Sequence, residues 1–185
     1  MMDTIMPDIP RFYTALAEWL ACMIFILPLK KRMAKKTIPL MAGALVVQSV
    51  FLVVTGNLMI YFWIPCMVIA VILMIGFIYG CCDIGSTDAI YFGMIAFVVA
   101  EFLASIEWQV VCFIWKGQMP ALWIRALLLI GIYGMHCICF AENHADTSAE
   151  RREMNISPKE LFSAQLIAIA VFAVSNLSFL TSNTP

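Results

Sequence analysis

Residues 88–115 carry the stretch DAIYFGMIAFVVAEFLASIEWQVVCFIW, an apolar run long enough to cross a lipid bilayer as one helix. Two acidic residues, Glu101 and Glu107, lie inside this run. A carboxylate near the centre of a bilayer costs about 3 kcal/mol or more, so acidic residues at such positions generally face the protein interior and have a function. The run therefore predicts a transmembrane helix and also marks the region most informative about function.

Five other stretches are also long and apolar enough to be membrane spans: 12–29, 37–55, 59–79, 121–140 and 161–180. The whole chain is 63% hydrophobic and 12% charged, and its mean hydropathy is +0.95. Soluble domains contain about 25% charged residues. The sequence thus predicts an all-α polytopic membrane bundle of about six spans, with residues 89–115 as the fourth. A net charge of −1 gives no basic face for nucleic acid.

The basic residues predict an orientation. Short loops rich in Lys and Arg stay in the cytoplasm. The first loop contains Lys30, Lys31, Arg32, Lys35 and Lys36, and the fifth contains Arg151, Arg152 and Lys159. We therefore expect the N-terminus outside the cell, and six spans place Pro185 outside as well. We expect residues 1–185 to be a single transmembrane domain from a longer protein.

Polar side chains from several spans fall in the outer half of the predicted membrane region. They are Glu18, Gln48, Glu107, Gln109, Arg125, Ser175 and Asn176. Polar groups in hydrocarbon face the bundle interior or a wet cavity, so this set predicts a ligand pocket open to the outside. The alternative is that the amides and hydroxyls join neighbouring helices by hydrogen bonds worth about 1 kcal/mol each, without any ligand.

The fourth span has two faces that predict contact with other helices, at about 100° per residue. Glu101, Ser105, Trp108 and Gln109 form a polar and aromatic stripe, whereas Ala96, Ala100 and Ala104 form a ladder of small residues on which Glu107 lies. Such a helix belongs at the centre of the bundle. The glycines Gly43, Gly76, Gly80, Gly93, Gly131 and Gly134 are likewise expected at close helix contacts.

Arg125 is the one basic residue well inside a predicted span, at about the depth of Glu107 on the preceding span. An ion pair between these two side chains would keep both of them charged within the membrane. In the alternative interpretation, the long side chain of Arg125 extends to the outer surface to reach water.

The seven cysteines contain no CxxC motif. Cys81 and Cys82 end the third predicted span, and His136, Cys137 and Cys139 end the fifth, on the same predicted cytoplasmic side. Thiolates and an imidazole would suit a soft metal ion. We favour the simpler interpretation that these cysteines pack as small hydrophobic residues, and we expect no cofactor or metal in this chain.

The block Ala100–Gln109, AEFLASIEWQ, resembles a segment in the N-terminal membrane regions of Firmicutes-type GHKL sensor histidine kinases. The resemblance is dense over about fifteen residues, and Ile95 departs from it where a basic residue is expected. It implies a cytoplasmic kinase beyond this chain that uses ATP and Mg²⁺, a response regulator as partner, and a homodimer. No catalytic residue is carried over, because His136 and His144 match no kinase motif.

We interpret the chain as the signal-sensing region of a two-component kinase in the bacterial plasma membrane, with no catalysis of its own. We expect Glu107 and Arg125 to bind or gate an unknown small-molecule or peptide signal, and Glu101 to set the helix geometry that transmits it. The full set of candidates for ligand binding or signal relay is Glu18, Gln48, Glu101, Ser105, Glu107, Trp108, Gln109, Arg125 and Asn176. One alternative is the substrate-binding membrane subunit of a vitamin-type uptake system, for which the small residues Ala17 and Ala21 would dock a partner. Another is a structural membrane subunit, in which the buried acids are dispensable.

Overall fold

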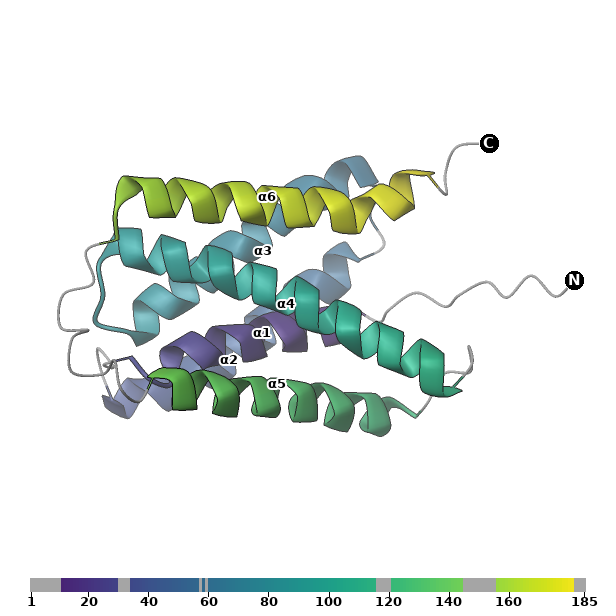
Figure 1. The fold of residues 1–185 in the computed structure, drawn as a ribbon, viewed down its shortest axis with the longest axis horizontal. Coiled ribbons are helices and arrows are strands. Elements are labelled where there is room, and N and C mark those ends of the chain that lie inside the picture. Colours follow the sequence, from purple (N-terminus) through teal and green to yellow (C-terminus); the bar gives the residue numbers. More distant parts are fainter. Residues whose placement is uncertain are drawn as a thin grey trace, which may run out of the picture.

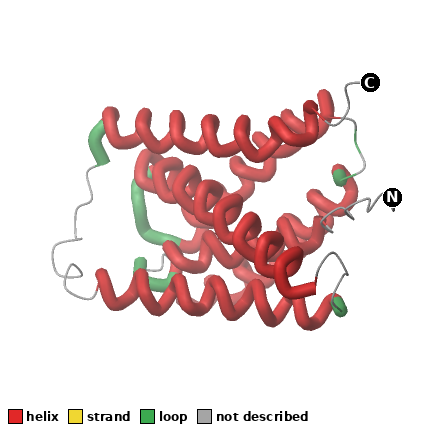
Figure 2. Tube along the Cα trace, turned by 45° about the vertical axis from the view of Figure 1, so that its right-hand side comes forward, coloured by secondary structure: helices red, strands yellow, loops and turns green. Residues whose placement is uncertain are grey.

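The computed structural model of the chain describes residues 11–29, 34–56, 58, 60–115, 121–144 and 156–181. Six helices account for nearly all of them: α1 (Arg11–Ile26), α2 (Ala34–Thr55), α3 (Ile60–Cys81), α4 (Ser86–Trp115), α5 (Leu122–His144) and α6 (Pro158–Thr181). Successive helices run in opposite directions (Figure 1), and the described residues contain no strand (Figure 2). The predicted all-α bundle is confirmed.

Helix α1 ends earlier than the sequence pattern predicts, at Ile26 instead of residue 29. Leu27 still donates its backbone N–H to the carbonyl of Met23, but the next residue is Pro28. Proline has no N–H to donate, and its ring disfavours helical geometry at the preceding residue. The other five helices begin and end within four residues of the predicted spans.

The start of α6 is fixed by a capping box. The backbone N–H of Ser157 donates to Glu160 Oε2 at 2.8 Å, and the backbone N–H of Glu160 lies 3.4 Å from Ser157 Oγ. Pro158 occupies the first helical position, where its missing N–H removes no helical hydrogen bond. Ser157 and Glu160 thus set the point at which the chain turns back into the bundle.

Helices α1 and α4 form the centre of the bundle. Helix α4 packs against α1, α3, α5 and α6, and α1 packs against α2, α3, α4 and α5. Figure 1 shows α4 crossing the molecule diagonally between α6 and α5. The expected central place of the fourth span is therefore confirmed.

Small residues bring α3 and α4 together at Gly93. A Cβ atom added there would lie 2.3 Å from Ile75 Cγ1 and 3.3 Å from Ile75 Cα, so only glycine fits this approach without a shift. The same expectation is wrong for four other glycines, which have no atom within 4 Å of an added Cβ: Gly43, Gly76, Gly131 and Gly134. These four lie on helix faces that no neighbouring helix covers closely.

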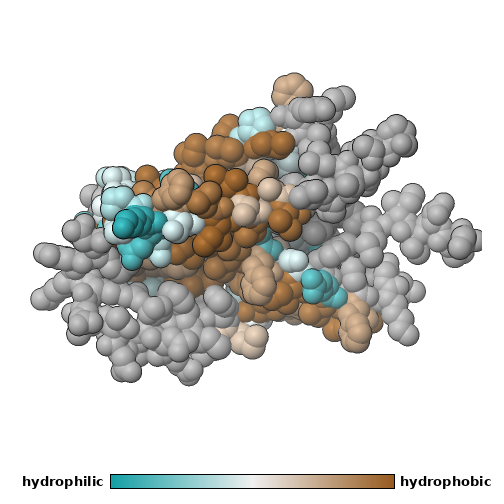
Figure 3. All heavy atoms as spheres, turned by 45° about the horizontal axis from the view of Figure 1, so that its top comes forward, coloured by the Kyte–Doolittle hydropathy of each residue, from teal (hydrophilic) through white to brown (hydrophobic). Residues whose placement is uncertain are grey.

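The outer surface of the bundle is unusually apolar. Ile38 and Val54 on α2 and Phe113 on α4 are 75%, 72% and 86% exposed. Figure 3 shows a broad hydrophobic surface over the middle of the described atoms. Water-soluble monomers seldom expose contiguous apolar patches of this kind, so the surface is suited to lipid.

Three described helices are long and apolar enough to cross a membrane: Lys36–Thr55, Phe62–Cys81 and Ser86–Val111. A shorter apolar segment, Trp123–Met135, lies in α5. Helix α1 has 16 residues and is too short to meet the same criterion. The chain thus has the character of a membrane protein.

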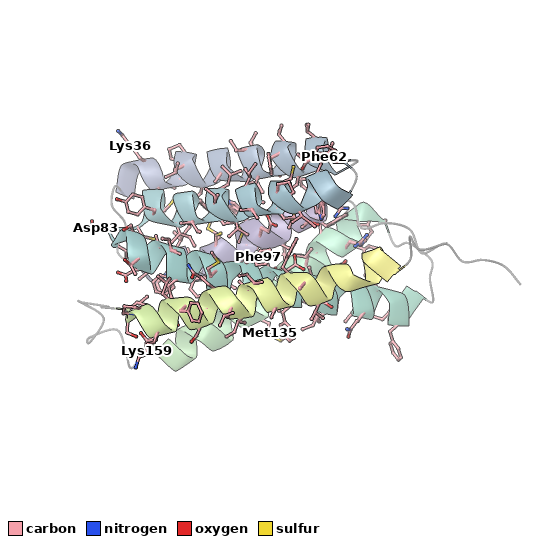
Figure 4. All side chains as sticks on the ribbon, turned by 90° about the horizontal axis from the view of Figure 1, so that it is seen from above. Lys36, Phe62, Asp83, Phe97, Met135 and Lys159 are labelled. Atoms are coloured by element: carbon pink, nitrogen blue, oxygen red, sulfur yellow. The ribbon has the colours of Figure 1, made fainter. Side chains whose placement is uncertain are left out.

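The two ends of the bundle differ in their charged groups. Lys36, Asp83 and Lys159 lie at the same end (Figure 4), where α2, α4 and α6 begin. Phe62, near the start of α3, lies at the opposite end. Glu107 and Arg125 lie in the half of the bundle that contains the start of α1, whereas Glu18, Glu101 and Tyr133 lie near the middle of their helices.

Candidate functional site: two buried polar clusters

The first cluster is an ion pair between α4 and α5. Arg125 Nε donates to Glu107 Oε1 at 3.0 Å, and Arg125 Nη2 donates to Glu107 Oε2 at 3.2 Å. Both side chains are 2% exposed. Two parallel bonds from a planar guanidinium to a carboxylate give the strongest and most directional form of such a pair. The predicted pairing is confirmed, and the alternative in which Arg125 reaches the surface is wrong.

Tyr13 completes this first cluster from α1. The guanidinium carbon of Arg125 lies 4.5 Å from the centre of the Tyr13 ring, and Tyr13 is itself buried. A cation over an aromatic face gains about 0.5–2 kcal/mol, with the larger value where water is excluded. Arg125 therefore holds α1, α4 and α5 together at one point. We refer to Tyr13, Glu107 and Arg125 as the ion-pair cluster.

The second cluster lies about one and a half turns further along α1. Gln48 Nε2 on α2 donates to Glu18 Oε2, and the side chains of both residues are buried. The other carboxyl oxygen, Glu18 Oε1, is buried and has no hydrogen-bond partner among the described residues. A buried oxygen in this condition is destabilising by about 1–3 kcal/mol, or more if it is charged.

Helices α4 and α5 add two more groups at this level. Glu101 on α4 and Tyr133 on α5 lie near enough to Glu18 for these groups to influence one another electrostatically. The Tyr133 hydroxyl lies 3.4 Å from the backbone carbonyl of Ala100, which is long for an O–H···O bond. We refer to Glu18, Gln48, Glu101 and Tyr133 as the carboxyl cluster.

The polar stripe predicted on α4 is not buried as a unit. Ser105 and Gln109 are exposed and Glu101 is half-buried, whereas Glu107 is fully buried. The reason is that α4 turns its small-residue ladder inward: Ala96 and Ala100 are buried, and Leu103, Glu107 and Val111 continue that face. Ser105 and Gln109 lie on the opposite side of the helix, so they do not join the predicted set around Glu107.

Two predicted site residues, Trp108 and Asn176, have side chains outside the described part of the structure, as does Ser175. Two residues that the sequence analysis did not select, Tyr13 and Tyr133, belong to the site. The sequence feature that could have identified them is a tyrosine in an apolar helix, at the depth of an acidic or basic residue on another helix. A buried Tyr hydroxyl generally needs a polar neighbour.

The cysteine grouping is described only in part. Cys81 and Cys82 are fully buried, while the side chains of His136, Cys137 and Cys139 lie outside the described residues. Within the described residues, no three His, Cys, Asp or Glu side chains come close enough to hold a metal ion. The burial of Cys81 and Cys82 agrees with packing as small hydrophobic residues.

No family model matches the chain, and neither a curated protein nor a solved structure is significantly similar to it. The resemblance of the block 100–109 to sensor kinases therefore rests on its residues alone. The structure adds that this block lies on the central helix and contributes Glu107 to the ion-pair cluster.

Proposed function

We propose that this chain is the signal-sensing membrane region of a two-component sensor histidine kinase of the GHKL type. It would cross the plasma membrane of a bacterium six times, with the N-terminus outside. The ion-pair cluster would lie in the outer half of the membrane and take part in binding the signal. ATP, Mg²⁺, the response regulator and dimerisation would belong to the complete kinase.

The observation that carries this proposal is the buried bidentate pair between Glu107 and Arg125. It lies within the block that resembles sensor kinases, on a helix that contacts α1, α3, α5 and α6. Replacing a buried ion pair by apolar residues is often neutral or stabilising. Stability alone therefore gives no reason to place this pair inside an apolar bundle, and a role in recognition does.

The chemistry of the pair indicates what kind of ligand would act on it. A ligand with a carboxylate or phosphate group would compete with Glu107 for the guanidinium of Arg125, and a ligand with an amine would compete for Glu107. Either exchange would loosen the contact among α1, α4 and α5. Because α4 also packs against α3 and α6, a shift of α4 would act directly on every described helix except α2. Ligand binding would thereby favour one of two arrangements of the bundle over the other.

The test uses the full-length protein, expressed with its response regulator and a reporter gene. Glu107→Gln and Arg125→Ala should each abolish the response to the inducing signal, and the double variant should lose little more, because both changes remove one interaction. Asp83→Asn, at an exposed turn, is the control. Normal signalling by both single variants would contradict the proposal, as would a reading frame that lacks a kinase after Pro185.

The transport alternative is weakened by one structural detail. Ala17 and Ala21, the small residues proposed to dock a partner subunit, are 1% and 0% exposed within the single chain. They are covered by the other helices of the bundle, so they present no free surface to a partner. No comparable observation favours transport.

A further inference from the structure

The carboxyl cluster presents an electrostatic problem that the ion-pair cluster does not. Glu18 is 1% exposed, and its carboxyl group accepts one hydrogen bond, from Gln48 to Oε2. Its second oxygen, Oε1, is buried without a partner. An ionised carboxylate removed from water is strongly destabilised unless a positive charge or several hydrogen bonds compensate it.

Among the described residues, the groups that act on Glu18 supply no positive charge. Gln48 from α2 donates a hydrogen bond to it, and Glu101 from α4 and Tyr133 from α5 are near enough to interact with it electrostatically. On α3, Cys81 lies near Cys22, one turn further along α1. Arg125 is engaged with Glu107 and Tyr13 at a different level of α1. One of the groups that act on Glu18 is thus itself an acid, Glu101.

A carboxyl group that is buried away from water retains its proton when no cation compensates its charge, and a nearby acid strengthens this preference. We propose that Glu18 binds a proton on its unpartnered Oε1, and that the nearby acid Glu101 favours the protonated form. Protonation converts a carboxylate and a proton into a neutral carboxylic acid. Gln48 continues to donate to Oε2 and fixes the orientation of the carboxyl group.

This site has a consequence for the fold, because Glu18 and Glu101 lie on the two central helices. Loss of the proton would leave a buried negative charge on Glu18, near the acid Glu101, and would weaken the contact between α1 and α4. The site is separate from the Glu107–Arg125 pair and does not depend on a kinase following this chain. It would make the bundle responsive to proton concentration in either a sensor or a transporter.

The test is infrared difference spectroscopy of the full chain in lipid nanodiscs, with ¹³C-labelled glutamate to assign the bands. At pH 7 the wild-type protein should show the carbonyl band of one protonated glutamic acid. Glu18→Gln should remove this band. Glu101→Gln should retain this band at low pH. As the pH is raised, the band should disappear at a lower pH than in the wild type, because the like charge that opposes ionisation of Glu18 is gone.

Two controls make the result specific. Glu160→Gln, at the exposed start of α6, should leave both the band and its pH dependence unchanged. If Glu18→Gln does not fold by circular dichroism, Gln48→Leu serves instead: it removes the donor to Oε2, so the band should remain but shift in frequency. A band that persists in Glu18→Gln, an unaltered pH dependence in Glu101→Gln, or displacement of the proton by NaCl at fixed pH would each overturn the proposal.

Discussion

At the scale of single residues, Arg125 on α5 joins side chains from two other helices, α1 and α4. It forms two hydrogen bonds with Glu107 and lies over the ring of Tyr13, with 1% of its surface exposed. Each partner comes from a different helix. Removal of Arg125 would therefore leave a buried carboxylate and a buried ring without their common partner.

We expect Arg125→Ala to lower the free energy of unfolding by about 3–5 kcal/mol, because it leaves Glu107 buried and uncompensated. Replacing both members, as in Glu107→Leu with Arg125→Met, should recover most of that loss. Denaturant titration in detergent, followed by circular dichroism, measures both effects. If the double variant is as unstable as Arg125→Ala, the loss arises from packing and not from the unpaired charge.

Tyr13 allows the ring and the hydroxyl to be tested separately. Tyr13→Phe keeps an aromatic face beneath the guanidinium, whereas Tyr13→Leu removes that face and should lower the free energy of unfolding by about 0.5–2 kcal/mol more than Tyr13→Phe does. The same titration measures the difference. Equal losses in the two variants would show that the hydroxyl, and not the ring, is what matters.

At the scale of helices, the contact between α3 and α4 depends on the missing side chain of Gly93. An added Cβ would overlap Ile75 Cγ1 and would lie in tight contact with the Ile75 Cα, 3.3 Å away, so Gly93→Ala should destabilise the protein although alanine favours helices. Gly76→Ala on α3 is the matched control, because nothing lies within 4 Å of its added Cβ. That variant should be neutral or stabilising by up to about 1 kcal/mol. The melting temperatures of the two variants in detergent test this expectation. Equal melting temperatures would contradict the close approach of α3 and α4 at Gly93.

Much of the helical layout follows from the sequence, because long apolar runs between charged loops leave few alternatives. The pairing of Glu107 with Arg125 was also predictable, since two buried opposite charges at one depth have few other partners. The sequence did not predict which face of α4 is buried. Glu101, Ser105 and Gln109 are polar residues at helical spacing, and periodicity alone does not show which face meets α1. Close packing of Ala96 and Ala100 decides this, and it turns Ser105 and Gln109 outward.

At the scale of the whole molecule, the alternating helices place the starts of α2, α4 and α6 at one end. We expect cysteines introduced at Asp83 and Lys159 to be labelled from the cytoplasm and one at Leu58 from outside, because basic loops stay inside. Impermeant thiol reagents on intact and opened cells distinguish the two sides, with unsubstituted protein as the control for native cysteines. Pro185, which the charge pattern predicts to be outside the cell, is not among the described residues. External labelling at Lys159 would reverse the proposed orientation.

The ion-pair cluster also constrains how the protein is synthesised. Glu107 leaves the ribosome eighteen residues ahead of Arg125, and its charge has no partner from α5 until that helix follows it. Translation proceeds at about 5–20 residues per second, so the interval lasts on the order of a few seconds at most. We therefore expect α4 and α5 to enter the bilayer together as a helical hairpin. A nascent chain that ends before Arg125 should insert α4 less efficiently than one that includes α5.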